Sequence, residues 1–289
     1  MNVEKLTRID RRIIFLVMAA VIAIPMLVAF DLPMTEQKPT LSLFRTIEEI
    51  DPEEQVLLVS TDYSPHTEAE NQPMTIAVLR HAFAKGVRVL IVSLYIESAG
   101  LAADAMDRTM EEFNREATSP ADSIVYGRDV AFLGWQPPPI VPILSMGESI
   151  AGIYPVDFYG NKTDSLAVMR GVQNYDDVGI VVALSGGEGP KWYVQFAQTK
   201  FGVKVGAGVT AVNTPDFYPY FETGQFSGMM GGMKGAAEYE ALVERTYGRE
   251  GRKRATEGMG SQSAAHMMII VFVLLGNVAY FAGRRRERR

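Results

Sequence analysis

The chain has 289 residues, of which 47% are hydrophobic and 21% charged, a composition that suits a folded core plus some membrane-type sequence. It contains no cysteine, which excludes disulfides, thiolate nucleophiles and cysteine-based zinc or iron–sulfur sites. The formal charge of −6 divides unevenly, because residues 1–12 carry +2, residues 284–289 carry +4 and the stretch between them carries −12, which argues against nucleic acid as a partner.

An uncharged apolar run, residues 13–30, follows the basic N-terminus. As a helix it would rise about 27 Å, enough to cross the hydrocarbon layer of a bilayer. A cleaved signal peptide also joins a basic start to an apolar core, but that core is usually about 7–15 residues long and a small-residue cleavage motif follows it. No such motif follows Phe30, so we predict an uncleaved anchor with a kink at Pro25.

From residue 55 onward, short apolar runs alternate with helical patterns. The expected strands are 56–60, 87–94, 130–133, 179–184 and 203–209, and the expected helices are 73–85, 101–117, 190–200 and 225–247. Apolar, β-branched strands without polar alternation are typical of a sheet covered on both faces. The alternation therefore predicts an α/β fold with a mostly parallel, doubly wound, Rossmann-like sheet of about five strands.

Polar residues follow the first expected strand. Asp62, Tyr63, His66 and Glu68 are candidates for ligand binding, because ligands of such folds bind at the carboxyl ends of the strands. These side chains could supply acid–base chemistry or hard metal ligands. A solvated loop that caps the next helix is the alternative, and one histidine with scattered carboxylates is too little to predict a metal site.

A glycine-rich turn follows the fourth expected strand. Its candidate ligand-binding residues are Ser185, Gly186, Gly187 and Glu188, and their backbone N–H groups could hold an anion. Glu188 would oppose a phosphate, and the pattern differs from a Walker sequence. A plain tight turn explains the same residues.

Residues 206–211 match the spacing G-x-G-x-x-A. A dinucleotide-binding turn needs a helix directly after these glycines, and we expect a loop around Pro215 instead. The sequence thus predicts no dinucleotide site, and it predicts no other cofactor, no catalytic residue and no serine-hydrolase elbow.

The most distinctive stretch is 213–235, which joins an aromatic cluster to a run of glycines and methionines. Each glycine lowers the stability of a helix by about 1 kcal/mol. Close packing of this segment against another element must offset that loss. That element is either the domain's own sheet or a second subunit. Under the second alternative the interface residues are Tyr218, Tyr220, Gly224, Gly228, Met229, Gly231, Gly232 and Gly235.

A second apolar run, 264–283, precedes an arginine-rich C-terminus. Its polar Asn277 is a further interface candidate, because an asparagine in lipid is expected to face another helix. Basic residues flank the outer end of each run, which predicts a protein of the inner (cytoplasmic) membrane with both termini in the cytoplasm and the middle outside it. Basic residues between 249 and 254 oppose this topology. The resulting division is a basic tail (1–12), a transmembrane helix (13–30), a lead-in (31–54), an extracytoplasmic α/β domain (55–248), a flexible linker (249–263), a second transmembrane helix (264–283) and a second basic tail (284–289).

Several local motifs resemble an uncharacterised bacterial family of membrane-anchored α/β proteins that has no assigned activity. They are Asp62-Tyr63-Ser64, residues 70–74, residues 79–82, Tyr218-Pro219-Tyr220 and the stretch from Thr223 to Glu240. The resemblance extends over most of residues 55–243. It implies the fold and the membrane anchor, and it carries over no functional residue.

Three functions are consistent with these features. The favoured prediction is a membrane-anchored extracytoplasmic interaction or assembly module, with the lipid bilayer and itself or other membrane proteins as partners. The alternative is an extracytoplasmic binder or sensor of a small ligand. The third is a hydrolase that uses Asp62 or Glu188 as its base. If the two side chains shared a direct role, both would have to face one pocket.

Overall fold

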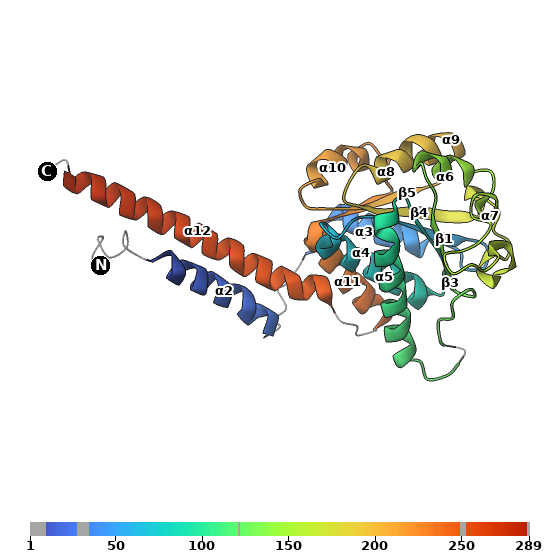
Figure 1. Cartoon of the computed structure of the whole chain (residues 1–289), viewed down its shortest axis with the longest axis horizontal. Helices are drawn as coiled ribbons and strands as arrows, with labels where there is room; N and C mark the ends of the chain where they lie inside the picture. The colour runs from blue at the N-terminus through green and yellow to red at the C-terminus, as the bar shows by residue number, and fades with distance from the viewer. Residues whose placement is uncertain (1–9, 28–34, 121, 249–252, 288–289) are drawn as a thin grey trace. The chain divides into compact units, whose positions relative to one another are not determined.

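The computed structural model describes residues 10–27, 35–120, 122–248 and 253–287 (Figure 1). They divide into two compact units. A globular unit extends from residue 34 to residue 255, and a second unit combines the segments up to residue 33 and from residue 256 onward.

The globular unit is built on a six-stranded, all-parallel sheet in the order β3-β2-β1-β4-β5-β6. The strands are β1 (Val56–Asp62), β2 (Arg88–Ser93), β3 (Val130–Trp135), β4 (Val178–Ser185), β5 (Val205–Val209) and β6 (Gly228–Gly231). Nearly every strand residue is buried, as expected for a sheet covered on both faces. The order confirms the predicted doubly wound, Rossmann-like sheet and adds a sixth strand.

Four helices cover one face of the sheet, seen below it in Figure 1: α3 (Lys38–Glu48), α4 (Glu68–Lys85), α5 (Ile96–Arg115) and α11 (Gly232–Tyr247). A polar network around the buried His81 joins three of them. Its two ring nitrogens lie 2.7 Å from the Tyr239 hydroxyl of α11 and 2.6 Å from a carboxylate oxygen of Glu48 of α3. The ring also stacks on Phe44 at 4.3 Å, so His81 is a satisfied core residue.

The opposite face carries shorter helical segments that connect β3 to β4, β4 to β5 and β5 to β6. They are α6 (Ile140–Ser145), α7 (Ile150–Ile153), η1 (Thr163–Ser165), η2 (Ala167–Met169), η3 (Tyr175–Asp177), α8 (Gly189–Trp192), the π-helical η4 (Tyr193–Gln198), α9 (Thr199–Phe201) and α10 (Thr214–Glu222). After β3 a long connection leads to β4, which pairs with the other side of β1. The order in which strands are added to the sheet therefore reverses between β1 and β4.

One predicted boundary was wrong at the edge strand β6. The helix expected from residue 225 begins only at Gly232, because residues 228–231 form β6. The segment 31–54, predicted as a lead-in, contains α3. A Cβ atom on Gly228 would lie 2.1 Å from the backbone nitrogen of Leu43, so glycine lets α3 lie directly on β6.

The second unit contains α2 (Arg11–Leu27) and α12 (Arg254–Glu287). Among the described residues, one helix is long and apolar enough to cross a membrane, and it is α12, over 254–281. The described part of α2 falls short of a span, and residues 28–30 of the predicted first crossing lie outside the described residues. The predicted flexible linker 249–263 is wrong from residue 254 onward, where α12 begins, and its residues 249–252 are not described.

Candidate functional site

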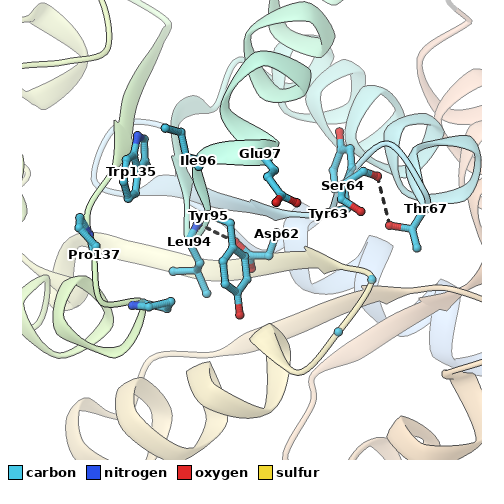
Figure 2. A pocket seen from close by; sticks show the side chains of 13 residues that line it. Asp62, Tyr63, Ser64, Thr67, Leu94, Tyr95, Ile96, Glu97, Trp135 and Pro137 are labelled. Atoms are coloured by element: carbon cyan, nitrogen blue, oxygen red, sulfur yellow. Dashed lines mark hydrogen bonds between the residues drawn. The ribbon is translucent and has the colours of Figure 1, made fainter.

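A cavity of about 490 Å³ opens at the carboxyl edge of the sheet, where parallel α/β sheets bind ligands (Figure 2). It extends from the reversal between β1 and β4 across the ends of β2 and β3. Its lining comprises Asp62, Tyr63, Ser64, Thr67, Leu94, Tyr95, Ile96, Glu97, Trp135, Pro137, Pro139, Gly186 and Gly187.

Asp62, the last residue of β1, contributes a carboxyl group to this lining although its side chain is only 4% exposed. The backbone N–H of Leu94 donates to Oδ1 at 3.0 Å, and the Ser60 hydroxyl donates to both carboxylate oxygens at 2.9 and 3.0 Å. The Tyr193 hydroxyl in turn donates to Ser60 Oγ at 2.9 Å. The donors that fix this carboxyl group are thus all neutral within the described ranges.

This environment raises the pKa of Asp62 to about 7. Burial is the main cause, because it penalises the charged form, and the hydrogen bonds from Leu94 and Ser60 oppose it. Near neutral pH the group therefore exists in both protonation states. It can accept a hydrogen bond or attract a cation when ionised, and it can donate a hydrogen bond when protonated.

The wall of the cavity is aromatic and apolar. Tyr95 and Ile96, at the end of β2 and the start of α5, are 42% and 62% exposed, and Trp135 ends β3. The Tyr95 ring also lies 6.3 Å from the ring of Trp192. In Figure 2 the Tyr95 ring stands beside Asp62, and Glu97 points from α5 toward the same space. Apolar walls around a few polar groups are typical of small-molecule sites.

Glycines bring two loops together at the closed end of the cavity. A Cβ atom on Gly186 would lie 2.5 Å from Thr67 Oγ1, and one on Gly189 would lie 2.7 Å from Asp62 Oδ2. The Ser185 hydroxyl donates to the backbone oxygen of Asp62 and accepts the N–H of Gly187. The turn after β4 therefore needs glycine for close approach to β1, as a tight turn would.

The structure brings together some of the predicted ligand-binding residues and separates others. Asp62, Tyr63, Gly186 and Gly187 line the cavity, whereas His66, Glu68, Ser185 and Glu188 do not. The Tyr63 hydroxyl bonds to Thr75, and Glu188 forms an exposed ion pair with Lys191. The predicted ligand-binding residues did not include Ser64 and Thr67 or the wall residues at the ends of β2 and β3, which are Leu94, Tyr95, Ile96, Glu97 and Trp135. The strand-end rule points to the ends of β2 and β3, but it does not separate side chains that face a cavity from side chains of the core.

The G-x-G-x-x-A match is part of β5 and not a ligand-binding turn. The expected loop was wrong, since α10 follows with Pro215 in its first turn. A Cβ atom on Gly206 would lie 2.4 Å from a Leu43 methyl carbon, and one on Gly208 would lie 2.3 Å from a Leu184 methyl carbon. Both glycines are thus covered by the core, and the absence of a phosphate-binding turn at this place follows from that packing.

Of the two explanations for the glycine-rich segment, the structure supports packing within the domain. Met229 is buried, and Cβ atoms on Gly231, Gly232 and Gly235 would lie 2.6 to 2.9 Å from atoms of the same domain. Gly224 forms a turn with φ 76°, Tyr220 is partly buried, and Tyr218 is 42% exposed. In the second unit, Asn277 is exposed and donates to the Val273 oxygen of its own helix. The interface assigned to these residues stays a prediction.

Within the described residues, no three His, Asp or Glu side chains are grouped as metal ligands. Comparisons of the chain with protein-family models, with curated proteins and with solved structures return no match. The chemistry of the cavity must therefore be inferred from its own residues.

Proposed function

We propose that the globular domain binds a small organic ligand in the cavity at the carboxyl edge of its sheet, with Asp62 as the principal polar contact. One observation carries this proposal: a buried carboxyl group, with no basic partner among the described residues, lies in the lining of a cavity of about 490 Å³ at the reversal of strand order. That volume falls in the range of about 300–1,000 Å³ that holds drug-sized ligands.

Binding is favoured over the hydrolase alternative because its two candidate bases do not share the cavity. A pair of Asp62 and Glu188 would have to face one pocket, and Glu188 lies outside the lining with its charge paired to Lys191. A nucleophilic role for Thr67 would require a base beside its hydroxyl group. That hydroxyl lies 3.5 Å from the backbone oxygen of Ser64, and His66 does not line the cavity.

The ligand-binding proposal can be tested with a variant that fills the cavity. Around Gly187 nothing lies within 4 Å of an added Cβ atom, so Gly187→Phe would place a ring in open space at the lining. Arg115→Phe, at the opposite end of α5, is the matched control on an exposed surface. A thermal-shift screen of small molecules on the detergent-solubilised full chain should give ligands whose shift disappears in G187F and persists in R115F. Shifts that survive in G187F would refute the cavity as the site.

We also propose that both apolar segments cross the cytoplasmic membrane and display the domain on its outer side. Support comes from the uncharged run 13–30, from the length and apolar character of α12, and from the basic residues at both outer ends. Because the chain has no cysteine, single introduced cysteines are clean reporters. A membrane-impermeant maleimide should label K162C in intact cells, and R289C only after permeabilisation. The reverse pattern would refute this topology.

A further inference from the structure

The charge of the cavity is one-sided. Its lining includes the two carboxyl groups of Asp62 and Glu97 and, among the described residues, neither lysine nor arginine. The N–H groups at helix N-termini on this edge normally attract anions. Here the chain supplies its own carboxylates, since Glu68 and Glu70 occupy the first turn of α4 and Glu97 the first turn of α5. An anionic ligand would meet repulsion where a dinucleotide-binding protein offers attraction.

Two aromatic rings line the same cavity as these carboxyl groups. Tyr95 adjoins Leu94, whose N–H holds Asp62, and Trp135 faces the cavity from β3. The faces of tyrosine and tryptophan attract cations by about 0.5–2 kcal/mol, depending on how far the site excludes water. Carboxylates and aromatic faces in one apolar cavity are complementary to a positive charge on an organic body.

Resting on the proposed function of the cavity, we propose that its ligand is an organic cation, an amine with an apolar or aromatic body. The ammonium group lies between Asp62 and Glu97, and the body packs against Tyr95, Ile96 and Trp135. A bound ammonium group supplies a basic partner, which the part of the chain that the structure describes does not give Asp62.

This proposal makes binding depend on pH in one direction. A cation binds the ionised form of Asp62, so its affinity falls as the pH drops through about 7, whereas a ligand that needs a hydrogen bond from the protonated acid behaves in the opposite way. The other titratable groups near Asp62 are Glu97, the Glu188–Lys191 pair of α8 and four tyrosines. Burial raises the pKa of the tyrosines, so they stay neutral over this range; they are Tyr63, Tyr95, Tyr154 and Tyr193.

Tryptophan fluorescence of the full chain in detergent reports on the cavity, because the chain has two tryptophans: Trp135 lines the cavity and Trp192 contacts Tyr95. Three probes share one aromatic body and differ in charge: phenethylamine, 2-phenylethanol and 3-phenylpropanoate. Only phenethylamine should give a strong, saturable change. Its dissociation constant should rise about thirtyfold between about pH 8.5 and about pH 5.5, as expected for a group with a pKa of about 7.

Variants separate the site from general effects. Asp62→Asn and Glu97→Gln should each weaken phenethylamine at least about tenfold at pH 8.5, while Glu111→Gln, an exposed carboxylate on the same helix α5, should leave its affinity unchanged. Circular dichroism shows whether each variant is folded. If Asp62→Asn unfolds the protein, Glu97→Gln and the pH series still decide the question.

The outcomes distinguish the two proposals. Tighter binding of the alcohol or the carboxylate than of the amine, or amine binding that strengthens at low pH, would overturn the cationic ligand and leave the cavity as a binding site. Failure of all three probes to change the fluorescence would count against both proposals.

Discussion

Asp62 gives the sharpest quantitative test of the structure, because an ionised carboxyl group in its position destabilises the fold. The environment raises its pKa from the ordinary value of 3.8 to about 7. Ionisation in the folded state then costs about 4 kcal/mol more than in the unfolded chain. Asp62→Asn retains the shape and the acceptor for the Leu94 N–H and removes the charge. After about 1 kcal/mol is allowed for weaker hydrogen bonding, the variant should gain about 3 kcal/mol at pH 8.

The direction of the pH dependence follows from proton counting. Between pH 3.8 and about 7 the folded protein holds more protons at Asp62 than the unfolded chain does, so the free energy of unfolding falls as the pH rises through this range. Below the ordinary pKa both states are protonated, and wild type and Asp62→Asn should then differ only by the hydrogen-bonding term. The advantage of the variant should therefore grow from near zero or slightly negative at pH 4 to its full value at pH 8.

The assay is urea unfolding of the full chain in detergent, followed by tryptophan fluorescence at several pH values. Both tryptophans lie in the globular unit, so the signal reports on that unit. Asp164→Asn, a substitution of an exposed aspartate in η1, is the matched control and should not change the pH profile. Equal stability of wild type and Asp62→Asn across the whole range would show that Asp62 is not held in a desolvated site.

Three further predictions concern packing elsewhere in the globular unit. Gly228→Ala should lose about 1–3 kcal/mol in the same urea assay, because its Cβ atom meets the backbone of Leu43, while Gly187→Ala, with open space around it, should stay within about 0.5 kcal/mol of wild type. Burial lowers the pKa of His81 from 6.5 to about 4, so wild type should lose about 3 kcal/mol as the pH falls through this range, and His81→Gln should flatten that loss in the same profile. Asn71→Asp replaces a buried donor to two strand-end carbonyl oxygens with an acceptor, and its thermal midpoint should drop at neutral pH and partly recover near pH 4.

The central strands were predictable because their sequences satisfy the local rule for a covered parallel sheet. The runs at 56–60 and 179–184 are apolar and β-branched, and in the structure β1 and β4 are neighbours at the centre of the sheet. The alternation with helices then favours parallel pairing with right-handed crossovers, which places all carboxyl ends on one edge. Asp62 could be found from the sequence for this reason alone.

The edge of the sheet could not be predicted in the same way. The strand β6 has only four residues, Gly228–Gly231, and two of them are glycines that local propensity assigns to turns. Their strand conformation depends on α3, which lies almost 190 residues earlier in the chain and buries Leu43 and Ile47 in the core. Because the local sequence of each segment does not indicate the other as its packing partner, neither α3 nor β6 was predicted.

The cavity wall was missed for a related reason. Tyr95 and Trp135 are aromatic residues at the ends of short apolar strands, where a sequence pattern cannot separate a core side chain from one that faces a cavity. Only the arrangement of β1, β2 and β3 side by side brings these rings to the same space as Asp62.

The strand order determines where a ligand can bind, and the loops determine its charge. In a dinucleotide-binding protein the turn after the first strand is rich in glycine and leaves room for a pyrophosphate at the helix N-terminus. Here the corresponding turn begins with Asp62 and reaches α4 through Ser64 and Thr67, and the carboxyl group of Asp62 lines the cavity at this turn. A buried carboxyl group that costs about 4 kcal/mol when ionised, and whose partners in the described structure are all neutral, is difficult to explain as a structural contact. The proposed cationic ligand would account for this cost, since it stabilises the ionised form that burial disfavours.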